Sequence, residues 1–205
     1  FSWLWSHTLL RPMAIILGLL NAIASLSAAV YILFAQEVLN TTVFIFAVLG
    51  TAAAVGGILG GLLGPKVSEK IGSGRSLAIA LFVMPLGALL IGFASQWYVV
   101  WVLVFFQTFA GVLWNVVTVS LRQSLIPTNL LGRVNSVYRF FAWGTIPIGT
   151  LLGGGVVFAL EGLIGREMAF RSVYFIGAAL GFILFVYAIR VLTTEAIDKA
   201  RASSS

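Results

Sequence analysis

Polar side chains that could contact a solute recur along one apolar segment, residues 97–121. Their spacing of three or four positions places them on one face of a helix. The stripe comprises Gln107, Gly111, Trp114, Asn115 and Thr118, and it continues to Arg122. A polar stripe on an apolar helix is expected to face a protein interior or a water-filled cavity. These residues could therefore bind a solute through hydrogen bonds and ring contacts.

The sequence lacks the constellations that enzymes and metal proteins need. It has no cysteine and one histidine, His7, so neither thiolate sites nor histidine clusters can form. No Ser-His-Asp set and no phosphate-binding glycine loop after a strand is present. The six acids lie in gaps between apolar segments or at their ends. We therefore predict no enzymatic activity, no cofactor and no metal. If transport is coupled to protons, the carrier is Glu37 or Glu69 near a mouth of the pathway, or it lies outside this chain.

The composition defines the environment of the chain. Hydrophobic residues make up 60% of the 205 residues and charged residues only 9%, which leaves too little polar surface to cover a soluble globule. The net charge of +6 comes from cations in short gaps between apolar segments. A nucleic-acid interface would instead cluster them on one solvated face. These features predict an integral membrane protein in a lipid bilayer, with no nucleic-acid partner.

About 20 apolar residues are needed for a helix to cross a bilayer. By this measure the chain is an all-α membrane protein with six transmembrane helices. We predict an interfacial segment at residues 1–11, a membrane domain at residues 12–192 and a cytoplasmic tail at residues 193–205. The predicted spans are residues 12–36, 41–64, 76–94, 97–121, 134–160 and 172–192.

The lysines and arginines orient these spans, because cytoplasmic loops are enriched in both. Two cations, Arg166 and Arg171, fall on one side of the predicted helices. The other side carries Arg11, Lys66, Lys70, Arg75, Arg122, Arg133, Arg139, Arg190, Lys199 and Arg201. We therefore predict a multi-pass protein of the inner or plasma membrane with both termini cytoplasmic. Ahead of the first span, His7 is expected to be a solvated residue of the inner interface.

The segment Val102–Val156 carries a family resemblance. An apolar helix ends in a basic loop with Pro127, and a second apolar helix then begins; its middle is LRQSLIPTNLLGRVNSVYRFFAWGTIPIGTLLGGG. This segment resembles the fourth and fifth helices of the C-terminal half of a major facilitator superfamily transporter. The RQ…IP…GRVNS run is most similar to the exporter branch that includes enterobactin and macrolide efflux proteins. The resemblance implies one six-helix half of that fold and transport by alternating access.

The stretch between spans two and three, Gly64 to Leu77, resembles the signature loop of the family. It departs from the pattern at Pro65 and Ser73. The resemblance implies a charge latch at the cytoplasmic gate, in which an acid meets cations of a neighbouring helix end. The alternative is a solvated turn whose cations only fix topology. The predicted gate residues are Glu69, Lys70, Gly72, Arg75, Arg122 and Arg133.

The resemblance also implies which helices line the solute pathway, because the first and fourth helices of each half line the central cavity in this family. The alternative for Ser25 is a hydrogen bond that holds neighbouring helices together. The predicted pathway residues are Asn21, Ser25, Gln107, Trp114, Asn115, Thr118 and Trp143.

Small residues four positions apart let helix backbones approach closely in a membrane. Gly57 and Gly61 in the second span form such a pair, as do Gly149 and Gly153 in the fifth. In the family these two helices face the opposite half, so we predict that these glycines form a seam with a second six-helix unit.

Together these features predict a half-sized transporter that works as a homodimer and exports small amphiphilic molecules such as drugs or siderophores. Two alternatives stay open. The chain could be the C-terminal half of a twelve-helix transporter, or a non-transporting assembly or regulatory subunit of the membrane. Import of a nutrient is also compatible with the residues.

Overall fold

The computed structural model describes residues 2–202, which form helices joined by short connections. Six helical stretches of this part of the chain are long and apolar enough to cross a membrane, so the predicted all-α fold is confirmed. The first span consists of α2 (Leu10–Ala28), α3 (Tyr31–Leu33) and a π-helical turn (Phe34–Val38), and the fifth of α7 (Leu131–Gly144) and α8 (Ile146–Ile164). The other spans are α4 (Val43–Ile71), α5 (Ser73–Phe93), α6 (Trp97–Leu125) and α9 (Arg166–Val191), and two short helices, α1 (Ser2–Ser6) and α10 (Thr194–Ala202), flank the bundle.

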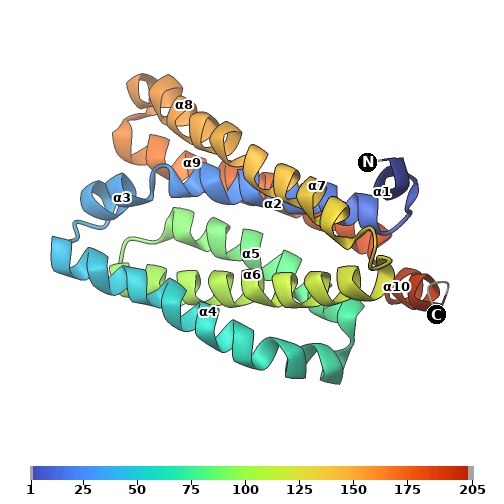
Figure 1. The fold of residues 1–205 in the computed structure, drawn as a ribbon. Coiled ribbons are helices and arrows are strands. Elements are labelled where there is room, and N and C mark those ends of the chain that lie inside the picture. Colours follow the sequence, from blue (N-terminus) through green and yellow to red (C-terminus); the bar gives the residue numbers. More distant parts are fainter. Residues whose placement is uncertain (1, 203–205) are drawn as a thin grey trace.

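The spans pair in a pattern with internal symmetry. Helix α4 packs along α6, α2 packs along α7 and α8, and α5 packs against α9. Figure 1 shows α4, α5 and α6 on one side of the bundle, and α2, α7, α8 and α9 on the other. If spans one, two and three are exchanged with spans four, five and six, the same pairs result. The contact between the first and fifth spans becomes the contact between the fourth and second, and the contact between the third and sixth is unchanged. The domain is therefore built as two three-helix repeats.

Glycines hold α8 against α2. A methyl group at Gly149 would collide with the carbonyl oxygen of Ala22, and one at Gly153 with that of Leu26. Lipid tails are as apolar as the helices, so packing at this distance replaces the hydrophobic drive of a soluble core. Gly149 and Gly153, predicted at a seam between two units, thus face α2 of their own chain.

The corresponding contact between α4 and α6 uses a different set of glycines from the predicted one. A methyl group at Gly56 would lie 2.5 Å from the carbonyl oxygen of Phe105, and one at Gly60 would lie 2.9 Å from Cβ of Val112. A methyl group at Gly57 would lie 3.9 Å from Cγ2 of Thr108, and one at the exposed Gly61 would meet nothing within 4 Å. The seam prediction therefore depends on Gly57 and Gly61, which are not packed closely against another helix of the described chain.

The predicted loop between residues 64 and 77 is wrong in extent. Helix α4 continues through Pro65 to Ile71, and α5 begins at Ser73, so the connection is a single corner at Gly72. Gly72 has a φ of 87°, a conformation that glycine adopts at little cost. Gly165, with a φ of 83°, makes the same corner between α8 and α9 at the other end of the bundle. The helices are longer than predicted because hydropathy detects only their lipid-spanning part.

Both ends of the described chain cap the same end of the bundle, called here the termini end (Figure 1). Leu4 of α1 and Ile197 of α10 are buried in one apolar cluster with the ends of the spans. Nδ1 of His7 accepts hydrogen bonds from the backbone N–H groups of Leu9 and Leu10, both at 3.3 Å. His7 is therefore a half-buried cap of α2, where a solvated residue was expected, and burial lowers its pKa. Residues 203–205 of the predicted tail lie outside the described chain.

Replacing Gly149 by alanine should lower the melting temperature of the purified protein in detergent. The added methyl group meets the backbone of Ala22, and overpacking of this kind costs about 1–3 kcal/mol. Gly154→Ala is the matched control, because nothing lies within 4 Å of that position and alanine favours the helix. Equal melting temperatures for the two variants would contradict the close packing of α8 on α2.

Candidate functional site

A polar groove opens between α2, α6 and α7, with a volume of about 420 Å³. It brings together four residues that the sequence predicted for the pathway or gate, Asn21, Asn115, Arg122 and Trp143. The complete lining is Leu17, Asn21, Asn115, Val119, Arg122, Asn135, Tyr138, Arg139, Ala142, Trp143 and Ile146. The groove therefore joins the first, fourth and fifth spans.

Arg122 is fixed in the groove by an aromatic ring. Its guanidinium carbon lies 4.4 Å from the ring centroid of Tyr138, within the range of a cation–π interaction. The hydroxyl of Tyr138 donates a 2.6 Å hydrogen bond to the carbonyl oxygen of Leu10, which locks the ring in place. Within residues 2–202, the ion pairs involve other arginines. The charge of Arg122 is thus positioned without being neutralised by a carboxylate.

Amides and a second cation complete the lining. Asn21 donates to the carbonyl oxygen of Leu17 at 2.9 Å, and Asn115 donates to that of Gly111 at 3.1 Å. Each amide uses one N–H on its own helix, so its oxygen and second N–H are available to a ligand. Arg139 adds a positive charge, and no acid is among the described residues of the lining. A solute with an acceptor or anionic group fits this chemistry.

Trp143 adds an aromatic ring to the aliphatic part of the groove, which Leu17, Val119, Ala142 and Ile146 form. Its side chain is 70% exposed, although it lies in a membrane-spanning stretch. An indole ring beside two guanidinium groups can stack on the flat or apolar portion of a solute. The groove therefore combines ring contact with cationic and amide recognition, which suits an amphiphilic molecule.

The polar stripe of α6 divides into two faces. Asn115, Val119 and Arg122, at positions i, i+4 and i+7, line the groove. The other residues of the predicted stripe lie on an adjacent face of α6, which is turned toward the interior of the bundle. These residues are Gln107, Gly111, Trp114 and Thr118. The stripe thus differs from the single cavity face that the sequence suggested.

The interior row of α6 serves packing. Gln107 donates a 2.8 Å hydrogen bond to the carbonyl oxygen of Met84 in the Pro85 region of α5. Trp114 is 2% exposed, and the hydroxyl of Thr118 donates to its carbonyl oxygen at 2.7 Å. None of these three residues lines the groove, and neither does Ser25. The three α6 residues thus stand behind the groove wall, Ser25 lies one turn beyond Asn21 on α2, and their contact with a solute stays a prediction.

The contribution of α7 was missed except for Trp143. Asn135, Tyr138 and Arg139 line the groove from this helix. Their positions relative to Trp143 follow the three- and four-residue spacing of a helical face, which is a signal present in the sequence. All three residues lie within the predicted fifth span, but Arg139 was interpreted by its charge alone, as a topology signal.

The predicted gate residues do not meet in one place. Arg122 lies in the groove, whereas Glu69 lines a separate hollow of about 600 Å³ with Asp198 of α10. Lys70, Arg75 and Arg133 are exposed. Glu69 forms no ion pair within residues 2–202, so its latch with Arg122 or Arg133 stays a prediction.

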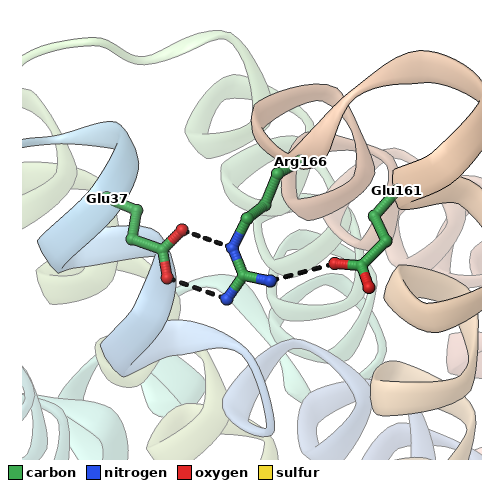
Figure 2. Close-up of polar contacts among 3 residues, drawn as sticks. All are labelled: Glu37, Glu161 and Arg166. Atoms are coloured by element: carbon green, nitrogen blue, oxygen red, sulfur yellow. Dashed lines mark hydrogen bonds and ion pairs between the residues drawn. The ribbon is translucent and has the colours of Figure 1, made fainter.

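A charge cluster that the sequence analysis missed closes the opposite end of the bundle. Figure 2 shows Arg166 between two acids. Its Nε and Nη2 donate to the two carboxylate oxygens of Glu37 at 2.6 and 2.9 Å, and its Nη1 donates to Glu161 at 2.9 Å. The bidentate geometry joins the π-helical end of the first span to the corner between α8 and α9. Glu37, considered above as a proton carrier, is thus engaged in an ion pair.

Arg171 has a structural role at the same end. It is 9% exposed and donates to the carbonyl oxygens of Gly92 and Ala94 at 2.8 and 2.9 Å, and to Glu167. The last carbonyl groups of a helix lack partners within the helix, so this arginine satisfies the C-terminal end of α5. Arg166 and Arg171, interpreted from the sequence as topology charges, both hold spans together.

Six apolar spans, an internal three-helix repeat and a polar groove between the first, fourth and fifth spans define a polytopic helical membrane protein of the transporter class. The family model of the Major Facilitator Superfamily matches residues 13–205. The chain belongs to the major facilitator superfamily, a family of membrane transporters. No curated protein and no solved structure matches the chain.

Thiol labelling should separate the two faces of α6. In this cysteine-free chain, Asn115→Cys should react with a water-soluble thiol reagent in membranes, whereas Gln107→Cys should be protected by α5. Thr128→Cys, in the exposed connection between α6 and α7, controls for reagent access. Equal labelling at positions 107 and 115, or protection of 115 while 128 reacts, would contradict the water-filled groove.

Proposed function

We propose that the chain transports small amphiphilic solutes and that the groove between α2, α6 and α7 is its binding site. The observation that supports this proposal is that Arg122 and Arg139 line the same groove as asparagine amides and the exposed ring of Trp143. Cations without carboxylate partners favour solutes that carry an anionic or acceptor group, and the ring favours an aromatic or apolar body. The sequence resemblance to enterobactin and macrolide exporters supports efflux as the direction of transport.

The shape of the groove supports a two-unit transporter. The first, fourth and fifth spans line the groove, and it is not enclosed by other spans of the described chain. Polar groups that face lipid are costly, so a second six-helix unit is needed to cover them. We propose that this unit is a second copy of the chain, related by an axis along the membrane normal as the halves of a full transporter are.

Orientation follows from charge. The termini end carries most of the cations, and cytoplasmic loops are enriched in lysine and arginine. We propose that both termini lie in the cytoplasm and that the Glu37–Arg166 cluster lies outside. The solute would then alternate between an inner opening near Arg122 and an outer opening beyond Trp143.

Replacing Arg122 by glutamine should reduce transport of an anionic aromatic dye by the purified protein in liposomes. Loss of a hydrogen-bonded charge costs about 1.5–3 kcal/mol, which corresponds to roughly a tenfold to hundredfold fall in kcat/KM. Arg122→Lys should recover part of the activity, because the charge stays while the planar stacking on Tyr138 is lost.

Lys66→Gln is the matched control, because Lys66 is exposed in α4 and lies outside the groove. Equal transport by Arg122→Gln and the unaltered protein would overturn the assignment of the groove. Absence of transport by the unaltered protein, with the fold intact, would instead favour the role of a non-transporting subunit or of half of a larger transporter.

A further inference from the structure

A second groove, separate from the polar one, runs along the surface of the bundle where α2, α8 and α9 meet. It has a volume of about 600 Å³ and is lined by aliphatic side chains, with the ring of Tyr187 at one end. Leu19, Leu152 and Ile183 line it and are 45%, 54% and 67% exposed. Among the described residues of the lining, none is charged. The groove therefore fits a hydrocarbon chain.

A polar hollow of about 730 Å³ lies at the termini end of α9. Arg190 and Lys199 line it, together with His7 and Thr8 of the connection between α1 and α2. No acid is among its described lining residues, and the ion pairs of residues 2–202 involve neither Arg190 nor Lys199. The hollow is thus a cationic site, and it begins where the sixth span ends at Val191.

The groove and the hollow are neighbours along α9. Tyr187 lines the groove and Arg190 lines the hollow, and residues three apart share one face of a helix. On α2, which runs antiparallel to α9 in Figure 1, Arg11 stands one turn before the groove residue Ile15. Cations from two helices therefore flank the same end of an apolar groove.

We propose that this surface binds one anionic phospholipid, with an acyl chain in the groove and the phosphate in the hollow against Arg190 and Lys199. A neutral acyl chain gains little from leaving bulk lipid for an apolar groove, because both environments are equally apolar. The groove therefore positions the lipid, and the cations at headgroup depth select its charge. This inference is independent of the transported solute, since the site lies on other faces of the bundle.

The test is native mass spectrometry of the full chain in detergent, with phosphatidylglycerol and phosphatidylcholine of identical acyl chains in equal amounts. Phosphatidylglycerol should be retained preferentially. Arg190→Gln should lower its retention about fivefold, the factor expected for one cation near an anionic headgroup. Arg190→Lys should keep most of it, and Lys66→Gln, which removes an exposed charge of α4 at the same end, should leave it unchanged.

A second arm separates a lipid from a free phosphate. Leu152→Trp should fill the groove and lower retention of phosphatidylglycerol, whereas Ile79→Trp, at an exposed position of α5, should not. Glycerol phosphate at millimolar concentration should not displace the lipid. Equal retention of the two lipids, equal losses in Arg190→Gln and Lys66→Gln, or displacement by glycerol phosphate would each overturn the proposal.

Discussion

The constraint that shapes this structure is that the hydrophobic effect does not drive its helices together, because lipid already surrounds them. Spans must then associate through backbone contact and through polar groups satisfied inside the bundle. Gly149 meets this requirement on α2, and Gly56 meets it on α6. These two contacts, α8 on α2 and α4 on α6, are exchanged when the two three-helix repeats are exchanged. The need for close backbone packing therefore acts on both repeats, and the polar groove lies between them.

The same constraint sorts the polar side chains by role. Gln107 and Arg171 are engaged inside the bundle. Gln107 donates a hydrogen bond to a carbonyl oxygen within α5, and Arg171 donates to one at the C-terminal end of α5. Arg122 and Asn115 are placed at a wall with hydrogen-bonding capacity left over. A membrane protein keeps such capacity only where water, solute or another subunit can use it. The groove is therefore the part of the bundle where function is expected, and the interior row behind it is the part that holds the wall in shape.

The sequence predicted the parts of this fold that depend on local composition. Hydropathy located all six spans, and the start of α6 at Trp97 agrees with the predicted span. It failed at the helix ends, as at Pro65 within α4, because helices project beyond the lipid that hydropathy senses. Helix α10 was missed for a similar reason, since its burial depends on one residue, Ile197, in a polar tail.

The candidate site was predicted in part. Of the predicted pathway and gate residues, Asn21, Asn115, Arg122 and Trp143 line the groove, and the two asparagines were predicted because polar residues are conspicuous in apolar helices. The polar stripe of α6 did not show which of two adjacent helix faces lines the groove. The packing of α5 decides this, because α5 covers the face that carries Gln107. Likewise, the bond between Arg166 and Glu37 joins residues 129 positions apart, and no local pattern signals such a pairing.

The central claim is that a second copy of the chain completes the groove, and cysteine cross-linking in native-like membranes tests it most directly. With a single cysteine in place of Gly61, which is exposed on α4, oxidation should give a covalent dimer and arrest transport until a reductant is added. Leu90→Cys, exposed on α5, should give no dimer. A chain that stays monomeric after oxidation at position 61 and still transports would contradict the account.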